Sequence, residues 1–299
     1  MIGLLAFFAG PFSHILMNAY ERFFNLLADK PVDRLPTTPI CMTFSARHAG
    51  VKYGAYIRDH RILVDTQIAM AEQFGLDVVG LISDPAREAE DCGAPVVWFD
   101  DQPTAHDANR ALLGDKSKLG KLTQPDPHAG RMLDRVQGAE LFRQQVGGQI
   151  PILGWVEGPM AEAADLRGMN QIMLDLVDDP VFCRDLFEFV IEMELNFARA
   201  QIEAGVDIMG IGDAAASLIG PALYHNRVYP YEKRLVDGIH AMGCPVRLHI
   251  CGNVDHLLPD IAKLGVEMID IDFLTDLKLA RQILGADVAI LGNFEPVRY

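Results

Sequence analysis

Five short segments of the chain share one pattern of apolar and polar positions. In each, an apolar helix end is followed by a glycine, one linking residue, an acidic residue or proline, and then a short apolar run; the runs cover residues 78–82, 208–211, 246–250, 268–271 and 288–291. Glycine suits the left-handed position that ends a helix. Short runs that are apolar throughout are typical of strands buried in a parallel sheet. The pattern therefore predicts helices that lead into buried parallel strands.

Two further apolar runs, 39–44 and 151–156, raise the number of predicted strands to seven. Between strands, Asp179 and Pro180 begin an apolar helical stripe that ends before Gly205. Strands and helices in alternation favour an α/β fold of the (β/α)8 TIM-barrel type over a doubly wound sheet, which stays the alternative. Because the sequence stops at Tyr299, directly after the seventh strand, we expect a barrel that lacks its last βα unit.

The same pattern predicts the domain organisation. Residues 17–299 are expected to form a single barrel domain, in which 85–149 is a long, turn-rich insertion over the barrel mouth. Residues 1–16 contain no Lys or Arg and are too short to span a membrane, so we expect neither a signal peptide nor an anchor. Asn18 and Glu21 resemble a capping box at a helix start. This makes Met17 a candidate for the biological start and 1–16 a candidate non-native extension.

Charge and cysteine content narrow the set of partners and compartments. The chain has 26 Lys and Arg against 41 Asp and Glu, a formal net charge of −15. Such a chain is repelled by nucleic-acid backbones and anionic membranes, so neither is expected as a partner. Its five cysteines are an odd number without close pairing. This fits a reducing compartment, and we expect a cytoplasmic protein.

Polar residues follow every predicted strand, and in a βα barrel all these strand ends meet at the face that carries the active site. In chain order they are Arg47 and His48, Asp84, Glu157, Asp213, the group His249, Cys251 and Asn253, the pair Asp270 and Asp272, and Asn293. For any one of them, a solvated strand end or a helix cap is an equally good explanation. Seven such ends that converge are better explained by a site.

His249 and Cys251 are the most specific pair in this set. Residues two apart on a strand point to the same side, so both side chains can reach one ion. Imidazole and thiolate are zinc ligands, and a catalytic zinc takes three protein ligands with one position left open. Glu157 or Asp213 could complete the coordination. Taken alone, the spacing favours a simpler explanation, a buried cysteine next to a hydrogen-bonded histidine.

Four segments resemble the uroporphyrinogen decarboxylase superfamily: 156–160 (VEGPM), 213–224 (DAAASLIGPALY), the run that begins LHICGN at 248, and 291–296 (LGNFEP). The HICGN motif resembles in particular the zinc-dependent branch of methylcobalamin:thiol methyltransferases, which serve coenzyme M and O-demethylase systems. The resemblance covers nearly the whole chain from Met17. It implies a (β/α)8 barrel, His249 and Cys251 as zinc ligands with Glu157 near the metal, a methylcobalamin donor on a separate corrinoid protein, and a thiol or related acceptor.

On this basis we expect a zinc-dependent methyltransferase in which Asp84, Glu157 and Asp213 act catalytically. The substrate would be placed by Arg47, His48, Asn253, Asp272 and Asn293. The branch takes a further zinc ligand from a C-terminal cysteine, which this chain lacks. Asn293 is equally compatible with a cap of the following helix.

Two alternatives remain. Arg47 and Gly50 match the RQAGR substrate motif of authentic uroporphyrinogen decarboxylase and Asp84 matches its catalytic aspartate, but His48 departs from the motif and the catalytic tyrosine is replaced around Asp165. A cofactor-free decarboxylase of porphyrin biosynthesis is the first alternative. The second is a truncated, inactive family member whose exposed edge strands pair with another copy to form a homodimer.

Overall fold

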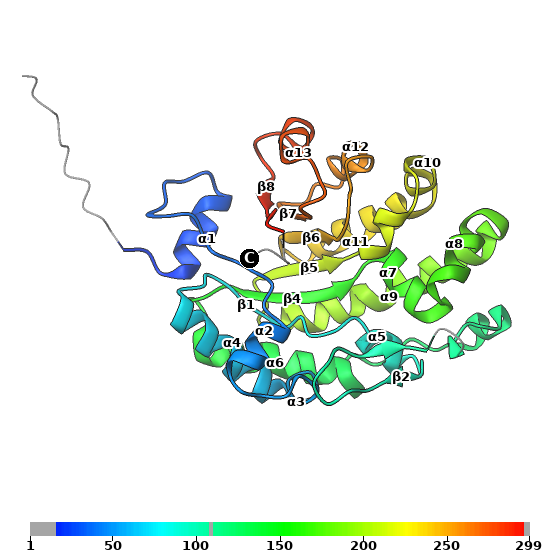
Figure 1. Ribbon diagram of the computed structural model, residues 1–299, viewed down its shortest axis with the longest axis horizontal. Helices are drawn as coiled ribbons and strands as arrows, with labels where there is room; N and C mark the ends of the chain where they lie inside the picture. The colour runs from blue at the N-terminus through cyan, green and yellow to red at the C-terminus, as the bar shows by residue number, and fades with distance from the viewer. Residues whose placement is uncertain (1–15, 108–109, 296–299) are drawn as a thin grey trace, which may run out of the picture.

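A six-stranded parallel sheet forms the centre of the computed structural model, which describes residues 16–107 and 110–295. The strand order is β1-β4-β5-β6-β7-β8, and the sheet curves so that helices cover its outer side (Figure 1). Each strand overlaps one of the predicted apolar runs: β1 (Val79–Gly80), β4 (Ile152–Glu157), β5 (Ile208–Gly212), β6 (Val246–Ile250), β7 (Met268–Ile271) and β8 (Ala289–Leu291). The predicted parallel α/β architecture is confirmed.

Helices fill the connections between these strands. They are α1 (Ala19–Leu27), α2 (Thr43–His48), α3 (Tyr53–Tyr56), α4 (His60–Phe74), α5 (Arg87–Asp91), α6 (Gly130–Val146), α7 (Pro159–Arg167), α8 (Met169–Asp178), α9 (Pro180–Glu203), α10 (Pro221–Leu223), α11 (Tyr229–Ala241), α12 (Leu258–Ile261) and α13 (Leu277–Leu284). The described residues also contain two 3-10 turns, Lys116–Lys121 and Ala214–Leu218, and a π-helical turn, Tyr224–Val228. Over the part of the chain that the structure describes, no helix is long and apolar enough to cross a membrane.

The helix starts that the sequence marks are formed as predicted. Asp179 accepts a hydrogen bond from the Phe182 N–H at the start of α9, with Pro180 in the first turn. Asn18 and Glu21 form a complete capping box at the start of α1. Residues 1–15, which include most of the expected extension, lie outside the described residues.

The strand predicted at 39–44 is wrong. Residues 39–42 join no ladder, and α2 begins at Thr43. Side chains occupy a backbone acceptor that a ladder would need. The Cys41 carbonyl accepts from Ser45 Oγ at 3.1 Å and also from Gln67 Nε2 of α4.

The segment 85–149, predicted as an insertion of loops, is only partly irregular. It contains a short antiparallel hairpin of β2 (Val96–Val97) and β3 (Ala105–His106). Its last part is α6, a 17-residue helix that packs against α4, α9 and β4 as part of the barrel wall. Its buried apolar positions Met132, Val136, Ala139, Phe142 and Val146 are three or four residues apart, so the sequence carried a helical signal that the prediction of an insertion missed.

Inside the curve of the sheet, the side chain of Trp155 leaves room only for glycine at two positions of the neighbouring strand. Trp155 on β4 is 3% exposed and lies across Gly210 and Gly212 of β5. A Cβ atom at Gly210 would be 2.3 Å from Trp155 Cε3, and one at Gly212 would be 2.8 Å from Cζ2. Both glycines are therefore required by close packing beneath the strand ends that carry the polar residues.

Candidate active site at the strand ends

His249 and Cys251 lie side by side at the C-terminal end of β6, as their spacing predicts. His249 Nε2 is 3.1 Å from Cys251 Sγ. The Cys251 residue is exposed and His249 is partly buried, with its ring 5.8 Å from the Trp155 ring between centroids. The thiol is thus accessible, while the imidazole is held against the wall of the barrel.

Asp270 on β7 holds the other nitrogen of this imidazole. Its Oδ2 is 3.2 Å from His249 Nδ1. Arg247 donates to both oxygens of the same carboxylate, from Nε at 2.9 Å and from Nη2 at 2.7 Å. From the sequence, Asp270 is one of the polar residues at the strand ends, but no function is predicted for it. Its partnership with His249 depends on the register of β6 against β7, which places the two residues opposite each other.

Opposite charges face each other in this network. Burial lowers the pKa of His249, but hydrogen bonds with Asp270 and Cys251 outweigh that effect and raise the pKa to about 9. Burial also opposes ionisation of Asp270, yet Arg247 and His249 bring the pKa of this carboxyl below its ordinary value. Asp270 is therefore an anion inside the barrel, paired with a buried arginine.

Glu157 faces the same interior from two strands away. In the sheet register Glu157 lies opposite Gly212, and Gly212 lies opposite His249. The Glu157 carboxyl accepts a hydrogen bond from Trp155 Nε1 at 3.1 Å and lies 3.9 Å from Arg87 Nη2. Burial and the nearby Glu88 raise the pKa of Glu157 well above its ordinary range, which favours the neutral acid.

The donor chemistry at His249 and Cys251 fits zinc, which takes imidazole nitrogen and thiolate sulfur. The carboxylate on the far nitrogen of His249 fits as well, because histidines that bind metals usually donate their other N–H to such a group. Within residues 16–107 and 110–295, no three His, Cys, Asp or Glu side chains are grouped to hold a metal ion. The described residues thus supply two ligands.

Asp84 follows β1 and is enclosed by its hydrogen-bond donors. Arg131 on α6 donates to both carboxylate oxygens, at 3.0 and 2.6 Å, and Thr104 Oγ donates at 2.9 Å. Burial opposes ionisation, but Arg131 outweighs it and lowers the pKa of Asp84 to about 2. This carboxylate is a buried anion that connects the end of β1 to α6 and to the hairpin.

Asp213 follows β5 and caps the start of α7. Its side chain accepts from the Ala161 N–H at 2.6 Å, and its own backbone N–H donates to the His249 carbonyl at 2.9 Å. Burial and a hydrogen bond with Glu232 raise the pKa of Asp213 well above its ordinary range. Tyr224 donates its hydroxyl to the same Glu232. Asp213 therefore links the α7 cap, a buried acid pair and the strand of His249.

Three of the predicted substrate-binding residues tie the loops at the barrel mouth together. Asp272 Oδ2 accepts from the Gly252 N–H at 3.0 Å. Asn253 and Asn293 each donate to a backbone carbonyl in the loop between β7 and α13, at 2.8 and 3.2 Å. These contacts join the segments that follow β6, β7 and β8 around Cys251.

Arg47 and His48, the other two predicted substrate residues, are exposed on α2. His48 Nε2 is 2.8 Å from Gln73 Oε1, and its ring packs against two exposed phenylalanines, Phe44 and Phe74. The structure shows no contact between these two residues and the His249–Cys251 pair.

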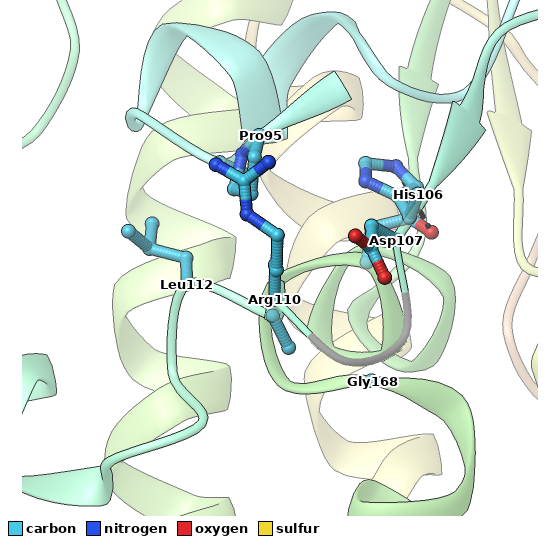
Figure 2. Close-up of a pocket in the computed structure, with 9 residues that line it drawn as sticks. Pro95, His106, Asp107, Arg110, Leu112 and Gly168 are labelled. Carbon is cyan, nitrogen blue, oxygen red and sulfur yellow. Dashed lines mark ion pairs between the residues drawn. The ribbon is translucent and has the colours of Figure 1, made fainter. Parts of the chain in front are cut away.

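A pocket beside the hairpin has no counterpart in the sequence-based prediction. Figure 2 shows His106, Asp107 and Arg110 lining it, and Asp165 of α7 also contributes. His106 Nε2 is 3.4 Å from Asp165 Oδ1. Burial lowers the pKa of His106 and raises that of Asp165 well above its ordinary range. Only Asp165 had a sequence signal, since it stands where the decarboxylases have a tyrosine.

Three glutamates are buried completely on helices around the sheet: Glu88 on α5, Glu162 on α7 and Glu194 on α9. Arg87 pairs with Glu88 at 2.9 Å. Both carboxyl oxygens of Glu162 are buried without a hydrogen-bond partner among the described residues. Burial, followed by the charges of neighbouring groups, raises the pKa of Glu162 and Glu194 well above the ordinary range. Burial thus favours the neutral form of Glu162 and Glu194.

A curved parallel sheet with helices outside it and polar residues at its C-terminal edge defines the class of α/β barrels that place their active sites at this edge. The family model described as uroporphyrinogen decarboxylase (URO-D) matches residues 18–299. The chain belongs to the uroporphyrinogen decarboxylase family, as the motifs predict.

Its relatives come from both branches of that family. The chain is 28% identical over 286 residues to the methylcobamide:CoM methyltransferase MtbA of Methanosarcina acetivorans, an alignment that covers 93% of this chain and 82% of the relative. It is 25% identical to the uroporphyrinogen decarboxylase of Trichlorobacter lovleyi, over 92% and 83% of the two chains. A solved methyltransferase from Methanosarcina mazei superposes with a TM-score of 0.83 at 21% identity, covering 93% and 83% of the chains. This superposition confirms the TIM-barrel fold class.

Proposed function

We propose that the chain is a methyltransferase that moves a methyl group from a methylated corrinoid, carried by a separate protein, to a thiol or related acceptor. The observation that carries the proposal is the His249–Cys251 pair, 3.1 Å apart at the strand end, with Asp270 on the far nitrogen. The relatives named as methylcobamide:CoM methyltransferases support the same chemistry.

In this proposal His249 Nε2 and Cys251 Sγ would hold a zinc ion. Zinc, when bound, deprotonates a coordinated thiol at neutral pH, where a free thiol with a pKa of about 8.5 is mostly protonated. Arg247 and Asp270 keep the imidazole in place. Glu157, as a neutral acid two strands away, is a hydrogen-bond donor toward the site, and Asp213 fixes the start of α7 beside it.

The remaining residues are assigned to binding. Arg47 contacts the acceptor from α2, and Asp84 acts on acceptor placement through Arg131, whose guanidinium it holds. Asn253, Asp272 and Asn293 connect the loops around Cys251, and these loops would line the entrance to the site.

Exposed apolar side chains on the loops after β5, β7 and β8 support the docking of a partner protein at this mouth. Leu218, Leu274 and Phe294 are 66%, 54% and 77% exposed, and Phe273 is 40% exposed. Apolar side chains gathered around one opening are typical of protein contact surfaces. We assign this rim to the corrinoid protein, which would bring its methyl group over Cys251.

Decarboxylation without a cofactor is the weaker alternative. It would require Asp84 to face a pyrrole intermediate. The Asp84 side chain is fully buried, and both of its oxygens accept hydrogen bonds from Arg131.

The test measures the zinc content of the purified chain by elemental mass spectrometry, together with methyl transfer from free methylcobalamin to a thiol. Cys251→Ser is compared with Cys41→Ser, which changes a half-buried cysteine outside the pair. We expect zinc and transfer in the wild type and in Cys41→Ser, and loss of both in Cys251→Ser. Zinc-free protein that still decarboxylates a tetrapyrrole would contradict the proposal and favour the alternative.

A further inference from the structure

We propose that Asp270 is the positioning residue of the His249–Cys251 pair, because it fixes the imidazole so that Nε2 is the nitrogen offered to a metal ion beside the thiol. The inference rests on the proposed function and extends it to a residue that no motif marks. The Asp270 carboxylate contacts Arg247 and His249, and it acts on the pair through His249.

The geometry around the ring carries the argument. An imidazole has two nitrogens, and a hydrogen bond to one of them decides which is left to bind a metal. Here Asp270 Oδ2 is 3.2 Å from Nδ1, and Cys251 Sγ is 3.1 Å from Nε2. The Trp155 ring lies 5.8 Å from the imidazole between centroids, tilted by 59°. Asp270 is the described side chain that occupies Nδ1.

Asp270 is itself held rigidly. Arg247 binds both of its oxygens, and the two side chains are 3% and 12% exposed for Arg247 and Asp270 respectively. Arg247 Nη2 also donates to the Thr38 carbonyl at 3.1 Å, which ties the pair to the extended segment before α2. Two hydrogen bonds from one arginine fix the orientation of a carboxylate. The fixed carboxylate in turn fixes the orientation of the imidazole that bonds to it.

A second histidine–aspartate pair in the chain provides a matched comparison. His225 Nδ1 is 3.0 Å from Asp260 Oδ2, so the same two atoms meet at nearly the same distance. This pair is at the surface, with the His225 side chain 55% exposed, and the other partner of Asp260 is Lys263, at 2.8 Å. Asp260→Asn therefore removes the same kind of charge without touching the candidate site.

The experiment uses the full chain and replaces the buried ion pair as a unit. Asp270 alone cannot be removed cleanly, since Arg247 would be left buried and unpaired, whereas apolar replacement of both partners is often tolerated. The double variant Arg247→Met/Asp270→Leu is compared with Asp260→Asn and with Arg247→Met, in which the Asp270 carboxylate keeps His249 as its partner. Circular dichroism and thermal melting show that each variant is folded.

Two measurements are made on each variant. The dissociation constant for zinc is measured by competition with a chromophoric chelator. Separately, the metal-free chain is examined by ¹H–¹⁵N NMR, in which an imidazole N–H bonded to a carboxylate gives a far-downfield signal, assigned with His249→Gln. The NMR measurement requires no metal, so it separates the role of Asp270 from the zinc proposal.

We expect the double variant to bind zinc about ten to a hundred times more weakly than Arg247→Met, as removal of such outer partners typically does, with Asp260→Asn unchanged. The downfield signal is expected in the wild type and in Arg247→Met and is expected to be lost in the double variant. Equal zinc affinity in the double variant and in Arg247→Met overturns the proposal. Absence of zinc binding by the wild type contradicts the proposed function, whereas absence of the signal from its spectrum overturns the role of Asp270.

Discussion

At the scale of single residues, the packing inside the barrel depends on the contact between the Trp155 side chain and Gly210, which has no side chain. Trp155 fills the space over Gly210, where even a methyl group would lie 2.3 Å from the indole. The same indole donates to Glu157 and packs near His249. Steric fit at Gly210 therefore affects the position of groups in the candidate active site.

We predict that Gly210→Ala lowers the free energy of unfolding by about 1–3 kcal/mol, because the new methyl group overpacks a filled interior. Thermal melting and urea denaturation measure the loss. Gly120→Ala is the control, since a Cβ atom there would meet nothing within 4 Å. Equal melting temperatures for the two variants would show that Trp155 can move aside.

At the scale of elements, α13 shows how a local cap supports the barrel mouth. Asp276 begins this eight-residue helix by accepting from the Lys278 and Leu279 N–H groups, at 2.8 and 3.1 Å. The loop before the helix carries the exposed apolar side chains Phe273 and Leu274. The cap therefore fixes both the helix and the adjoining part of the rim.

We predict that Asp276→Ala costs about 1 kcal/mol through the loss of the cap. Hydrogen exchange followed by mass spectrometry should show faster exchange of the amides of α13, while those of α9 stay protected. Asp287→Ala, an exposed aspartate beyond the end of the helix, should leave both unchanged. Uniform faster exchange over the whole chain would instead indicate global destabilisation.

Elements were predictable from the sequence where local signals agree. The run at 246–250 is apolar, bounded by a glycine pattern, and is the strand β6 with the predicted bounds. The run at 39–44 has similar composition, yet Ser45 and Gln67 both donate to its Cys41 carbonyl, and α2 starts within it. Those competing partners are distant or helical, so the run itself carries no sign of them.

At the scale of the whole molecule, buried acids make stability depend on pH. Burial and the charges of Glu194 and Glu88 raise the pKa of Glu162 well above its ordinary range. The folded chain keeps a proton that the unfolded chain releases above a pKa of about 4.3. Stability is therefore fully present below that pH and is lost as the pH rises toward the folded-state pKa.

We predict that the free energy of unfolding falls as the pH rises from about 5 to about 8, by roughly 1.4 kcal/mol for each unit by which the pKa of a buried acid is raised in that range. Glu162→Gln should flatten this profile and be more stable than the wild type at the alkaline end. Urea unfolding at several pH values measures it. Glu192→Gln, which changes an exposed glutamate of α9, should follow the wild type; a Glu162→Gln profile parallel to both would refute the prediction.

The outer edge of β8 is a further feature of the whole molecule, because β8 is the last strand of the sheet. Within the described residues, β8 pairs with β7 on one side and with no strand on the other. The homodimer expected from such an edge stays a prediction.

The sequence by itself determined the alternation of strands and helices, the helix caps and the His249–Cys251 pair, because each depends on neighbours a few residues away. Two residues apart on one strand means the same face, whatever surrounds the strand. The partners of those residues were decided by tertiary structure alone. Asp270 meets His249 through the register of two strands, and Arg131 closes on Asp84 across 47 positions of sequence. Contacts of this kind depend on how the elements pack, and no local pattern encodes them.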